Sequence, residues 1–244
     1  MTGSSGKLGS SIYSSNLVPD ILAPSRVELD ITKPHQLDGF FLDNTIDAVI
    51  HCAALARMSE CHKNPELAIE TNIIGTYNLI KAVVRAEKSY KKKIRFIHIS
   101  TDGVYEGITG DYSETSETRP YNTYGWTKLA AEDHVKKLQD YCILRTRFFD
   151  PNNISFESAA TDIFSSSLPL KELVQIIADL LFIDFKGVLN IGGQTLSDYE
   201  RYKIYKPTIT PTTKKNISKD LEFKIATNSS LDLNLMKKII SREQ

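Results

Sequence analysis

The sequence predicts an α/β fold, in which a doubly wound parallel sheet carries a small C-terminal α/β lobe. Short apolar runs typical of buried strands alternate with longer segments whose apolar residues recur at helical spacing. The strand-like runs lie at residues 46–51, 94–99 and 141–146, and the helical segments at residues 66–86 and 121–138. This alternation is typical of a parallel sheet whose faces are covered by helices.

The composition indicates a cytoplasmic globular protein. The 244 residues are 41% hydrophobic and 25% charged, with 30 basic against 30 acidic residues. Because the net charge is zero, we expect neither nucleic acid nor anionic lipid as a partner. No apolar run approaches the ~20 residues of a membrane span and no signal peptide follows Met1, so we expect neither insertion into a membrane nor secretion. The three widely spaced cysteines predict reduced packing residues and no metal site.

Three glycines near the start have the spacing of a dinucleotide-binding turn. Gly3, Gly6 and Gly9 accompany a segment, residues 8–13, that opens a helix. Glycines at this spacing permit a tight turn and let backbone N–H groups approach a pyrophosphate at a helix N-terminus. Such a turn normally follows a strand, so the first strand is missing from the expected sheet. Either the start is truncated or another segment takes this position, because an unfilled position exposes two strand edges.

Residues 20–29 are expected to contain a short second strand, whose end decides which nicotinamide cofactor binds. An acidic residue there accepts a hydrogen bond from the ribose 2′-hydroxyl of NAD(H), whereas an arginine binds the 2′-phosphate of NADP(H). Arg26 follows Ser25, and no carboxylate occurs before Glu28. This pattern favours NADP(H), with NAD(H) the less favoured cofactor. The alternative for Arg26 is a surface charge.

A candidate catalytic group follows the apolar run that ends before Ser100. Thr101 and Asp102 would emerge there, at the strand end where open α/β sheets bind ligands. Tyr124 and Lys128 lie one turn apart in the next helical segment, so their head groups face the same side. An ammonium beside a phenol lowers the pKa of the phenol and lets it exchange a proton with a carbonyl or an alcohol. The alternative is a half-buried tyrosine beside a solvated lysine.

These motifs, in this order, resemble the extended short-chain dehydrogenase/reductase family, and within it the dTDP-4-dehydrorhamnose reductase-like (RmlD-like) sugar-nucleotide proteins. The resemblance runs from Thr2 to about the C-terminus and is densest before Pro151. It implies a Rossmann-type fold and an NAD(P)-dependent oxidoreductase of nucleotide-sugar metabolism, in dTDP-rhamnose biosynthesis, that reduces a nucleotide-linked 4-keto-6-deoxy sugar. In that reaction Tyr124 would supply the proton, Thr101 would hydrogen-bond the carbonyl oxygen, and Lys128 would hold the cofactor ribose.

The same resemblance assigns the remaining site residues. The turn at residues 52–55 would pass close to the cofactor, and Asn72 would hold the backbone of the active site. Asp30 and Ile31 would lie beside the adenine, and the alternative for Asp30 is an N-cap of the following helix. The expected cofactor contacts are Gly3, Ser5, Gly6, Lys7, Leu8, Arg26, Asp30, Ile31, Cys52, Ala53, Ala54, Leu55, Asn72, Ser100, Tyr124 and Lys128. The expected substrate contacts are Arg57, Met58, Thr101, Asp102, Tyr124, Arg147 and Phe149.

Other activities on the same fold can be ranked. Dehydratases of this family follow the threonine with an Asp-Glu pair, and Gly103 replaces the second acid here, which disfavours dehydration. Epimerisation needs only oxidation, rotation and re-reduction by a retained cofactor, so it stays open. A non-catalytic NADP-binding subunit, resembling the regulatory subunit of methionine adenosyltransferase, also stays open. For Arg57 and Met58 the alternative is a solvated arginine beside a core methionine.

We expect an NADP-binding Rossmann domain over residues 1–150 and a small substrate-binding lobe over residues 151–244. Residues 170–193 are expected to return to the Rossmann sheet, through an amphipathic helix and a short strand. The sequence pattern of residues 198–205 predicts a further helix. The expected partner is a nucleotide-sugar substrate, and a homodimer is left open.

Overall fold

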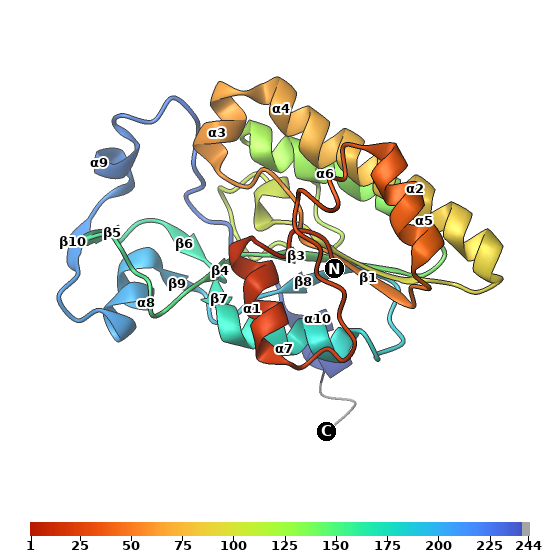
Figure 1. Cartoon of the computed structure of the whole chain (residues 1–244). Coiled ribbons are helices and arrows are strands. Elements are labelled where there is room, and N and C mark those ends of the chain that lie inside the picture. Colours follow the sequence, from red (N-terminus) through yellow and green to blue (C-terminus); the bar gives the residue numbers. More distant parts are fainter. Residues whose placement is uncertain (241–244) are drawn as a thin grey trace.

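A computed structural model describes residues 1–240, and a four-stranded parallel sheet forms its centre (Figure 1). The strands, in spatial order, are β1 (Ala48–His51), β2 (Arg95–Ile99), β3 (Tyr141–Thr146) and β8 (Gly187–Ile191). In the shared register Ile50 lies beside Ile97, and Ile97 lies beside Cys142. The predicted α/β fold with a parallel sheet is confirmed.

Helices cover both faces of this sheet (Figure 1). One face carries α2 (Pro34–Asp43), α5 (Thr76–Tyr90) and α6 (Thr123–Val135), and the other carries α1 (Lys7–Ser15), α7 (Leu170–Leu180) and α10 (Asn234–Ile240). Successive side chains of a strand point to opposite faces, so Phe96 packs beneath one helix layer and Ile97 beneath the other. Both are fully buried, as expected for parallel strands covered on both sides.

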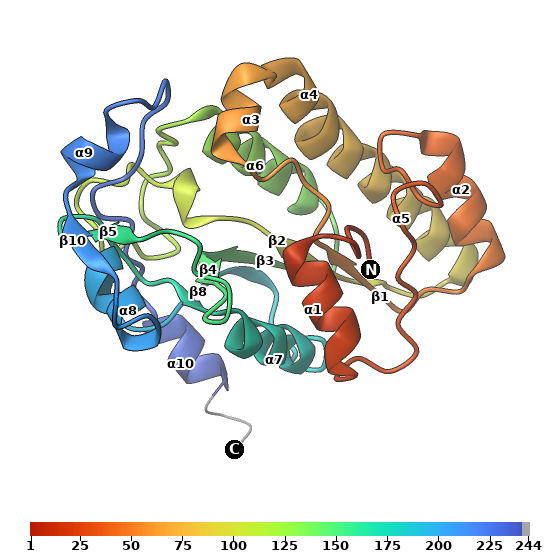
Figure 2. The same ribbon diagram turned by 60° about the vertical axis from the view of Figure 1, so that its left-hand side comes forward.

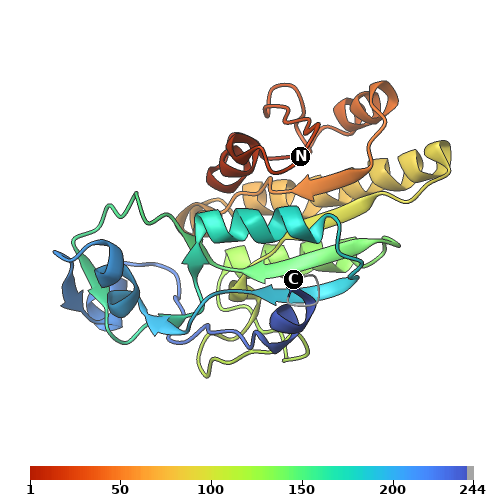
Figure 3. The same ribbon diagram turned by 90° about the horizontal axis from the view of Figure 1, so that it is seen from below.

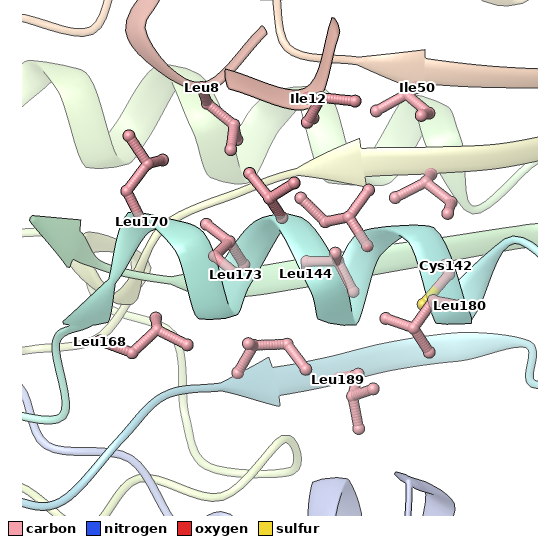
Figure 4. Packing of buried hydrophobic residues seen from close by; sticks show 14 of the residues in the cluster. Leu8, Ile12, Ile50, Cys142, Leu144, Leu168, Leu170, Leu173, Leu180 and Leu189 are labelled. Atoms are coloured by element: carbon pink, nitrogen blue, oxygen red, sulfur yellow. The ribbon is translucent and has the colours of Figure 1, made fainter. Parts of the chain in front are cut away.

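An aliphatic cluster fixes α1 and α7 against the sheet (Figure 4). Leu8 and Ile12, one turn apart on α1, pack with Leu173 of α7 and Leu189 of β8 in this cluster. Burying a side chain of this size contributes roughly 1.5–3 kcal/mol. The position of α1, and with it the glycine turn that precedes α1, is therefore set by packing against α7.

The long helix expected at residues 66–86 is divided by a π-helical turn. Helix α4 (Pro65–Ile69) leads into this turn (Glu70–Gly75), which leads directly into α5. A short helix that we did not expect, α3 (Met58–Lys63), precedes α4. Single π-helical turns frequently occur at functional sites, and this one carries Asn72.

The second strand expected within residues 20–29 is wrong, because these residues form loops and turns. A strand needs a hydrogen-bonded neighbour, and on the edge of β1 away from β2 the only pairing within residues 1–240 is the isolated parallel bridge between Thr2 and His51. The alternative role of Asp30 as a helix N-cap is also wrong, because Lys33 occupies that position. Asp30 instead accepts hydrogen bonds from the N–H and hydroxyl of Thr32, at 2.9 and 2.8 Å, and closes a local turn.

A small lobe lies beyond the carboxyl ends of the sheet strands (Figure 3). Its elements are β4 (Phe148–Phe149), β5 (Ser158–Ala160), β6 (Phe164–Ser165), β7 (Leu168–Pro169), β9 (Leu196–Ser197), α8 (Asp198–Tyr205), β10 (Thr210–Thr212) and α9 (Lys214–Ser218) (Figure 2). They form three two-stranded ladders, and α8 begins with a capping box between Ser197 and Glu200. The chain returns from the lobe to the sheet through α7 and β8. The division into two domains stays a prediction.

The cysteines carry free thiols, and Cys61 and Cys142 are buried. Within residues 1–240, no cluster of three or more His, Cys, Asp or Glu side chains is arranged to hold a metal ion. None of the helices described is both long and apolar enough to cross a membrane.

Substitutions at Gly9 and Gly39 test how closely the glycine turn packs on α1. Gly9 lies in α1 against this turn, and Gly39 in α2 is the control. A Cβ at Gly9 would lie 2.2 Å from the carbonyl oxygen of Gly3, whereas a Cβ at Gly39 in α2 would meet no atom within 4 Å. We predict that Gly9→Ala lowers the free energy of unfolding by about 1–3 kcal/mol, because backbone must move to accept the methyl group. Gly39→Ala should raise it by roughly 0.5–1 kcal/mol through better helix propensity. Urea unfolding measures both, and a neutral Gly9→Ala would contradict the close approach.

Candidate active site

The glycine turn lies between Thr2 and the start of α1, with Gly3 half-buried and Gly6 exposed. The N–H of Gly6 donates to the carbonyl of Gly3 at 3.0 Å, and Gly3 has φ +71°, a left-handed conformation that favours glycine. A Cβ at Gly3 would lie 2.6 Å from the nitrogen of Ala53, so the turn passes directly against the end of β1. Helix α1 begins without a side-chain cap, which leaves its first N–H groups available to an anionic group. The turn therefore fits a dinucleotide pyrophosphate.

Asn72 holds the turn at residues 52–55 and connects it to α6. Its Oδ1 accepts from the N–H of Leu55 at 2.7 Å, and its Nδ2 donates to the carbonyl of Leu55 at 3.0 Å. The same Nδ2 lies 2.9 Å from the hydroxyl oxygen of Thr127 on α6. Asn72 is fully buried, so all of its polar atoms need such partners. The backbone beyond β1 is thereby fixed relative to the helix that carries Tyr124.

A cavity of about 360 Å³ opens at the carboxyl ends of β2 and β3. Its lining brings together residues expected at the substrate or the cofactor, namely Met58, Ser100, Thr101, Asp102, Tyr124 and Arg147. These residues come from the start of α3, from the strand ends and from α6. Thr101 and Tyr124 thus face one space, although 23 positions separate them in the sequence.

Asp102 is buried, and its carboxylate is engaged by three groups. Its Oδ2 accepts from Nε of Arg147 and from the hydroxyl of Ser229, both at 2.7 Å. Its Oδ1 lies 3.2 Å from the hydroxyl of Thr101, which in turn accepts from the N–H of Gly103 at 3.1 Å. Asp102 therefore orients Thr101 and Arg147 at the mouth of the cavity and joins them to the C-terminal segment.

The expected lowering of the Tyr124 pKa is wrong. Burial raises the pKa of Tyr124 above its ordinary value, and the negative charge of Asp102 raises it further. Tyr124 and Lys128 share a helix face. The charge of Lys128 nevertheless changes the pKa values of His51 and His98 and does not lower that of Tyr124. Tyr124 consequently keeps its proton at neutral pH.

Lys128 is a buried cation one turn after Tyr124 on α6, and it is not among the residues that line the cavity. Its side chain is 2% exposed, and burial lowers its pKa from 10.5 to about 8, against the opposing effect of Glu132. Two buried imidazoles lie near it. Burial and the Lys128 charge lower the pKa of His51 to about 3 and that of His98 well below its ordinary value. At neutral pH the ammonium therefore faces two uncharged rings.

A buried ion pair fixes α6 against the sheet. Glu132 on α6 accepts from Nε and Nη2 of Arg145 on β3, at 3.0 and 2.7 Å. The hydroxyl of Ser100 also donates to Glu132, at 2.6 Å, so this expected cofactor residue turns its side chain into the core. Because both partners of the pair are buried, breaking the pair would leave the Arg145 guanidinium buried without a counter-charge.

Several expected site residues lie outside the cavity. Arg26 is 68% exposed and pairs with Asp30 at 3.3 Å, beyond the glycine turn. Arg57 is 80% exposed and pairs with Glu60, in agreement with the alternative of a solvated arginine. Phe149 was expected at the substrate, but Phe148 lines the cavity and Phe149 packs against Tyr202 and Tyr205. Successive residues of an extended chain point in opposite directions, which accounts for the exchange. Ile31 is buried in the apolar cluster beneath α2 and α5.

Sequence reasoning missed several residues that line the cavity, among them Tyr121, Asn122, Phe148 and Tyr202. Asn122 carried a signal, because an asparagine just ahead of a helical segment is a typical N-cap. Its side chain accepts a hydrogen bond from the N–H of Gly125 at 2.9 Å. Asn122 is thus the N-cap of α6, two residues before Tyr124. Tyr202 had no such signal, since it reaches the cavity from α8 in the lobe.

Comparisons with known proteins agree with this geometry. A family model described as "RmlD substrate binding domain" matches residues 1–158. The chain is 37% identical over 123 residues to a probable low-salt glycan biosynthesis reductase, Agl14, of Haloferax volcanii, covering 50% of this chain and 39% of that protein. It is 35% identical over 129 residues to a dTDP-4-dehydrorhamnose reductase of Mycolicibacterium smegmatis, covering 52% of this chain and 37% of that protein. The matches span about two fifths of the length of these curated relatives.

Solved structures show the same fold. A dTDP-4-dehydrorhamnose reductase from Bacillus anthracis, in complex with NADP, superposes with a TM-score of 0.85 at 24% identity, covering 97% of this chain and 90% of that one. A hypothetical dTDP-4-dehydrorhamnose reductase from Sulfolobus tokodaii superposes with a TM-score of 0.82 at 26% identity, covering 98% and 93%. The expected Rossmann-type architecture is thereby confirmed.

The burial of Lys128 makes a prediction about stability and pH. Because its folded pKa of about 8 lies below the ordinary value of 10.5, the folded chain binds this proton less tightly than the unfolded chain does. We predict that Lys128→Met raises the free energy of unfolding by about 1–3 kcal/mol at pH 7. This advantage should shrink as the pH rises from 8 toward 10.5, where the native lysine loses its charge. Denaturant unfolding at pH 7, 8.5 and 10 measures it, with the exposed Lys137→Met as control. A destabilised Lys128→Met at pH 7 would contradict the buried, unsolvated ammonium.

Proposed function

The chain belongs to the RmlD substrate-binding domain family, and from this premise we propose that it is an NADP-dependent reductase of a nucleotide-linked 4-keto-6-deoxy sugar. The observation that carries the proposal is the shared cavity of Thr101 and Tyr124, with Lys128 one turn further along α6. The reductase names of the relatives support the same reaction class. Roles for individual residues are part of the proposal.

The chain's own residues would transfer the proton and stabilise the negative charge that develops on the carbonyl oxygen. NADPH, when bound, supplies the hydride that adds to the carbonyl carbon of the sugar. Tyr124 donates its proton to the carbonyl oxygen, and the hydroxyl of Thr101 hydrogen-bonds the same oxygen as negative charge develops on it. The raised pKa of Tyr124 suits this direction, because the phenol holds its proton until the carbonyl oxygen becomes basic. Lys128, charged at neutral pH because its pKa of about 8 lies above 7, would hold the cofactor ribose.

The residues of the N-terminal turn fit the cofactor's pyrophosphate. Gly3 supplies the left-handed turn, and the start of α1 supplies unpaired N–H groups and a favourable dipole. Asn72 holds the turn at residues 52–55, against which Gly3 packs. A 2′-phosphate would meet Arg26, whose guanidinium is exposed and paired with Asp30 only at its Nε.

Dehydration is a weaker candidate. The position after Asp102 is Gly103, and Asp102 itself is engaged by Arg147 and Ser229, so neither position offers a free carboxylate to act as a base. Reduction needs no such base. Epimerisation remains distinguishable by experiment, because it returns the cofactor unchanged whereas reduction consumes NADPH.

Replacing Tyr124 by phenylalanine tests the proton donor. We expect Tyr124→Phe to lower turnover of NADPH with a 4-keto-6-deoxy sugar nucleotide by at least ~10²-fold, since the proton source is lost. The Kd for NADPH should change little, because the substitution removes one hydroxyl and keeps the half-buried ring. Stopped-flow absorbance with a panel of such sugars measures turnover, and fluorescence titration measures binding.

Tyr77→Phe, on the exposed side of α5, serves as the matched control and should keep full activity. Turnover retained by Tyr124→Phe would overturn its assignment. Native protein that converts the sugar without consuming NADPH would establish an epimerase, and native protein that binds NADPH but converts no sugar would favour a binding subunit.

Replacing Arg26 tests the choice of cofactor. We predict that the native protein binds NADPH on the order of tenfold more tightly than NADH, because a 2′-phosphate forms charge-assisted hydrogen bonds with the guanidinium. Arg26→Ala should remove most of this preference and leave NADH affinity nearly unchanged. The exposed Arg85→Ala on α5, paired with Asp38, is the control. Equal affinities in the native protein would refute the preference, and an unchanged preference in Arg26→Ala would move its origin elsewhere.

A further inference from the structure

Two side-chain hydroxyls at the candidate cavity are buried without a hydrogen-bond partner. Thr146 and Ser167 both line this cavity, and they are only 4% and 3% exposed. Within residues 1–240, neither Oγ1 of Thr146 nor Oγ of Ser167 finds a partner, and both oxygens are shielded from solvent. Buried polar groups are normally paired, so two unpaired hydroxyls in one wall indicate a ligand that pairs with them.

The other serine and threonine that line the cavity are engaged by the protein itself. The hydroxyl of Ser100 donates to Glu132 at 2.6 Å, and the hydroxyl of Thr101 accepts from the N–H of Gly103 at 3.1 Å. Thr101 is already expected at the carbonyl oxygen of the substrate. Thr146 and Ser167 have neither a partner in the chain nor a role in the proposed reaction.

The register of the sheet places Thr146 beside Thr101. The N–H of Ser100 donates to the carbonyl of Leu144 at 2.7 Å, so the ladder between β2 and β3 continues past Ile99. The same register brings Thr101 opposite Thr146, on strands about 4.8 Å apart. Residues opposite each other in a ladder turn their side chains to the same face. A group that lies next to one bound by Thr101 is therefore within reach of Thr146.

A second ladder places Ser167 close to Thr146. Phe148 on β4 lies opposite Leu168 on β7, and the N–H of Leu168 donates to the carbonyl of Arg147 at 3.1 Å. Ser167 precedes Leu168, so it lies beside Arg147, the residue directly after Thr146. The two unpaired hydroxyls thus come from neighbouring positions of adjacent chain segments.

The backbone that carries Ser167 is held by Arg201, which is buried. Nη1 of Arg201 donates to the carbonyl of Ser167 at 2.5 Å, and Nη2 donates to the carbonyls of Ser165 and Leu196. A guanidinium bound to several carbonyls leaves this segment little freedom. The hydroxyl of Ser167 is therefore positioned before a ligand binds, which lowers the entropic cost of binding.

A neutral group that both donates and accepts hydrogen bonds suits this pair. The charged residues of the lining, Asp102 and Arg147, bind each other at 2.7 Å, and serine and threonine hydroxyls donate and accept alike. The ring hydroxyls of a sugar have the same properties. In a 4-keto-6-deoxy hexose, the carbon next to the carbonyl carries the 3-hydroxyl. With Thr101 at the carbonyl oxygen, this hydroxyl is the group that Thr146 can reach.

We propose that Thr146 and Ser167 determine substrate specificity by hydrogen-bonding the sugar hydroxyl next to the carbonyl that is reduced. The inference rests on the proposed reductase function and names the feature of the sugar that is selected. A site built to pair with a hydroxyl rejects an analogue that lacks it, because the buried polar groups of the site then stay unpaired. The chain consequently selects a sugar with a free 3-hydroxyl over its 3-deoxy form.

The test compares dTDP-4-keto-6-deoxy-D-glucose with the same compound lacking the 3-hydroxyl. We expect native protein to prefer the hydroxylated sugar by at least ~10²-fold in kcat/KM. Thr146→Val and Ser167→Ala should each lower kcat/KM for the hydroxylated sugar about tenfold and that for the 3-deoxy sugar less than about twofold, since only the first loses a hydrogen bond. Thr146→Ser keeps the hydroxyl and should keep most of the preference. The Kd for NADPH should stay the same throughout.

Thermal unfolding without ligand tests the unpaired hydroxyl directly. Thr146→Val replaces it by a methyl group of similar size, so we expect the Tm to rise by about 2 °C or more. Thr76→Val is the matched control, because Thr76 is equally buried but its hydroxyl donates to the carbonyl of Asn72 at 2.7 Å. This control should lower the Tm. A lower Tm for Thr146→Val would show that its hydroxyl is already paired, which would overturn the proposal.

The kinetic outcomes separate this inference from the proposed function. An equal loss of kcat/KM for both sugars would mean a structural role for Thr146 and Ser167, and a higher Kd for NADPH would assign their hydroxyls to the cofactor. Either result would overturn the specificity while native turnover leaves the reductase standing. Native protein that reduces neither sugar would overturn the proposed function and this specificity together.

Discussion

The buried ion pair between Glu132 and Arg145 is the interaction on which the arrangement of the site depends. A buried pair is stable only when its remaining hydrogen-bonding groups also find partners. Here a further guanidinium nitrogen of Arg145 donates to the hydroxyl of Tyr105 at 2.9 Å, and that hydroxyl lies 2.9 Å from Oδ1 of Asn190 on β8. One network therefore joins α6, β3 and β8. Because α6 carries Tyr124 and Lys128, this network fixes both against the strand end that carries Thr101.

A second network connects the sheet to the C-terminal segment. Asp102 binds Arg147, which follows β3, and Ser229, which lies 127 positions further along the chain. Nearby, Tyr112 forms a parallel bridge with Leu231. The C-terminal segment around Ser229 is thus tied to residues at the candidate cavity that lie far from it in the sequence. The electrostatics around the cavity follow from the same burial, since the carboxylate of Asp102 and the ammonium of Lys128 are held in place with little access to water.

Much of the site was predictable because the motifs are local. The three glycines specify a turn, since only glycine accepts the conformation of Gly3 and its contact with Ala53. Tyr124 and Lys128 share a helix face because of their spacing. The pKa of Tyr124 was not predictable in this way. It depends on how deeply the ring is buried and on the orientation of Asp102, and both are set by residues far away in the sequence.

The sequence by itself determined the alternation of strands and helices, because apolar periodicity acts over a few residues. It also determined the turn at Gly3 and the candidate Thr-Tyr-Lys set. Only the tertiary structure decided that residues 20–29 form no strand, since a strand exists only beside a neighbour and these residues do not pair with the edge of β1 that lies away from β2. It likewise decided that Phe148, and not Phe149, faces the cavity, and that Tyr202 joins it from the lobe. These outcomes depend on long-range packing, in which the partner of each residue is not its neighbour in the chain.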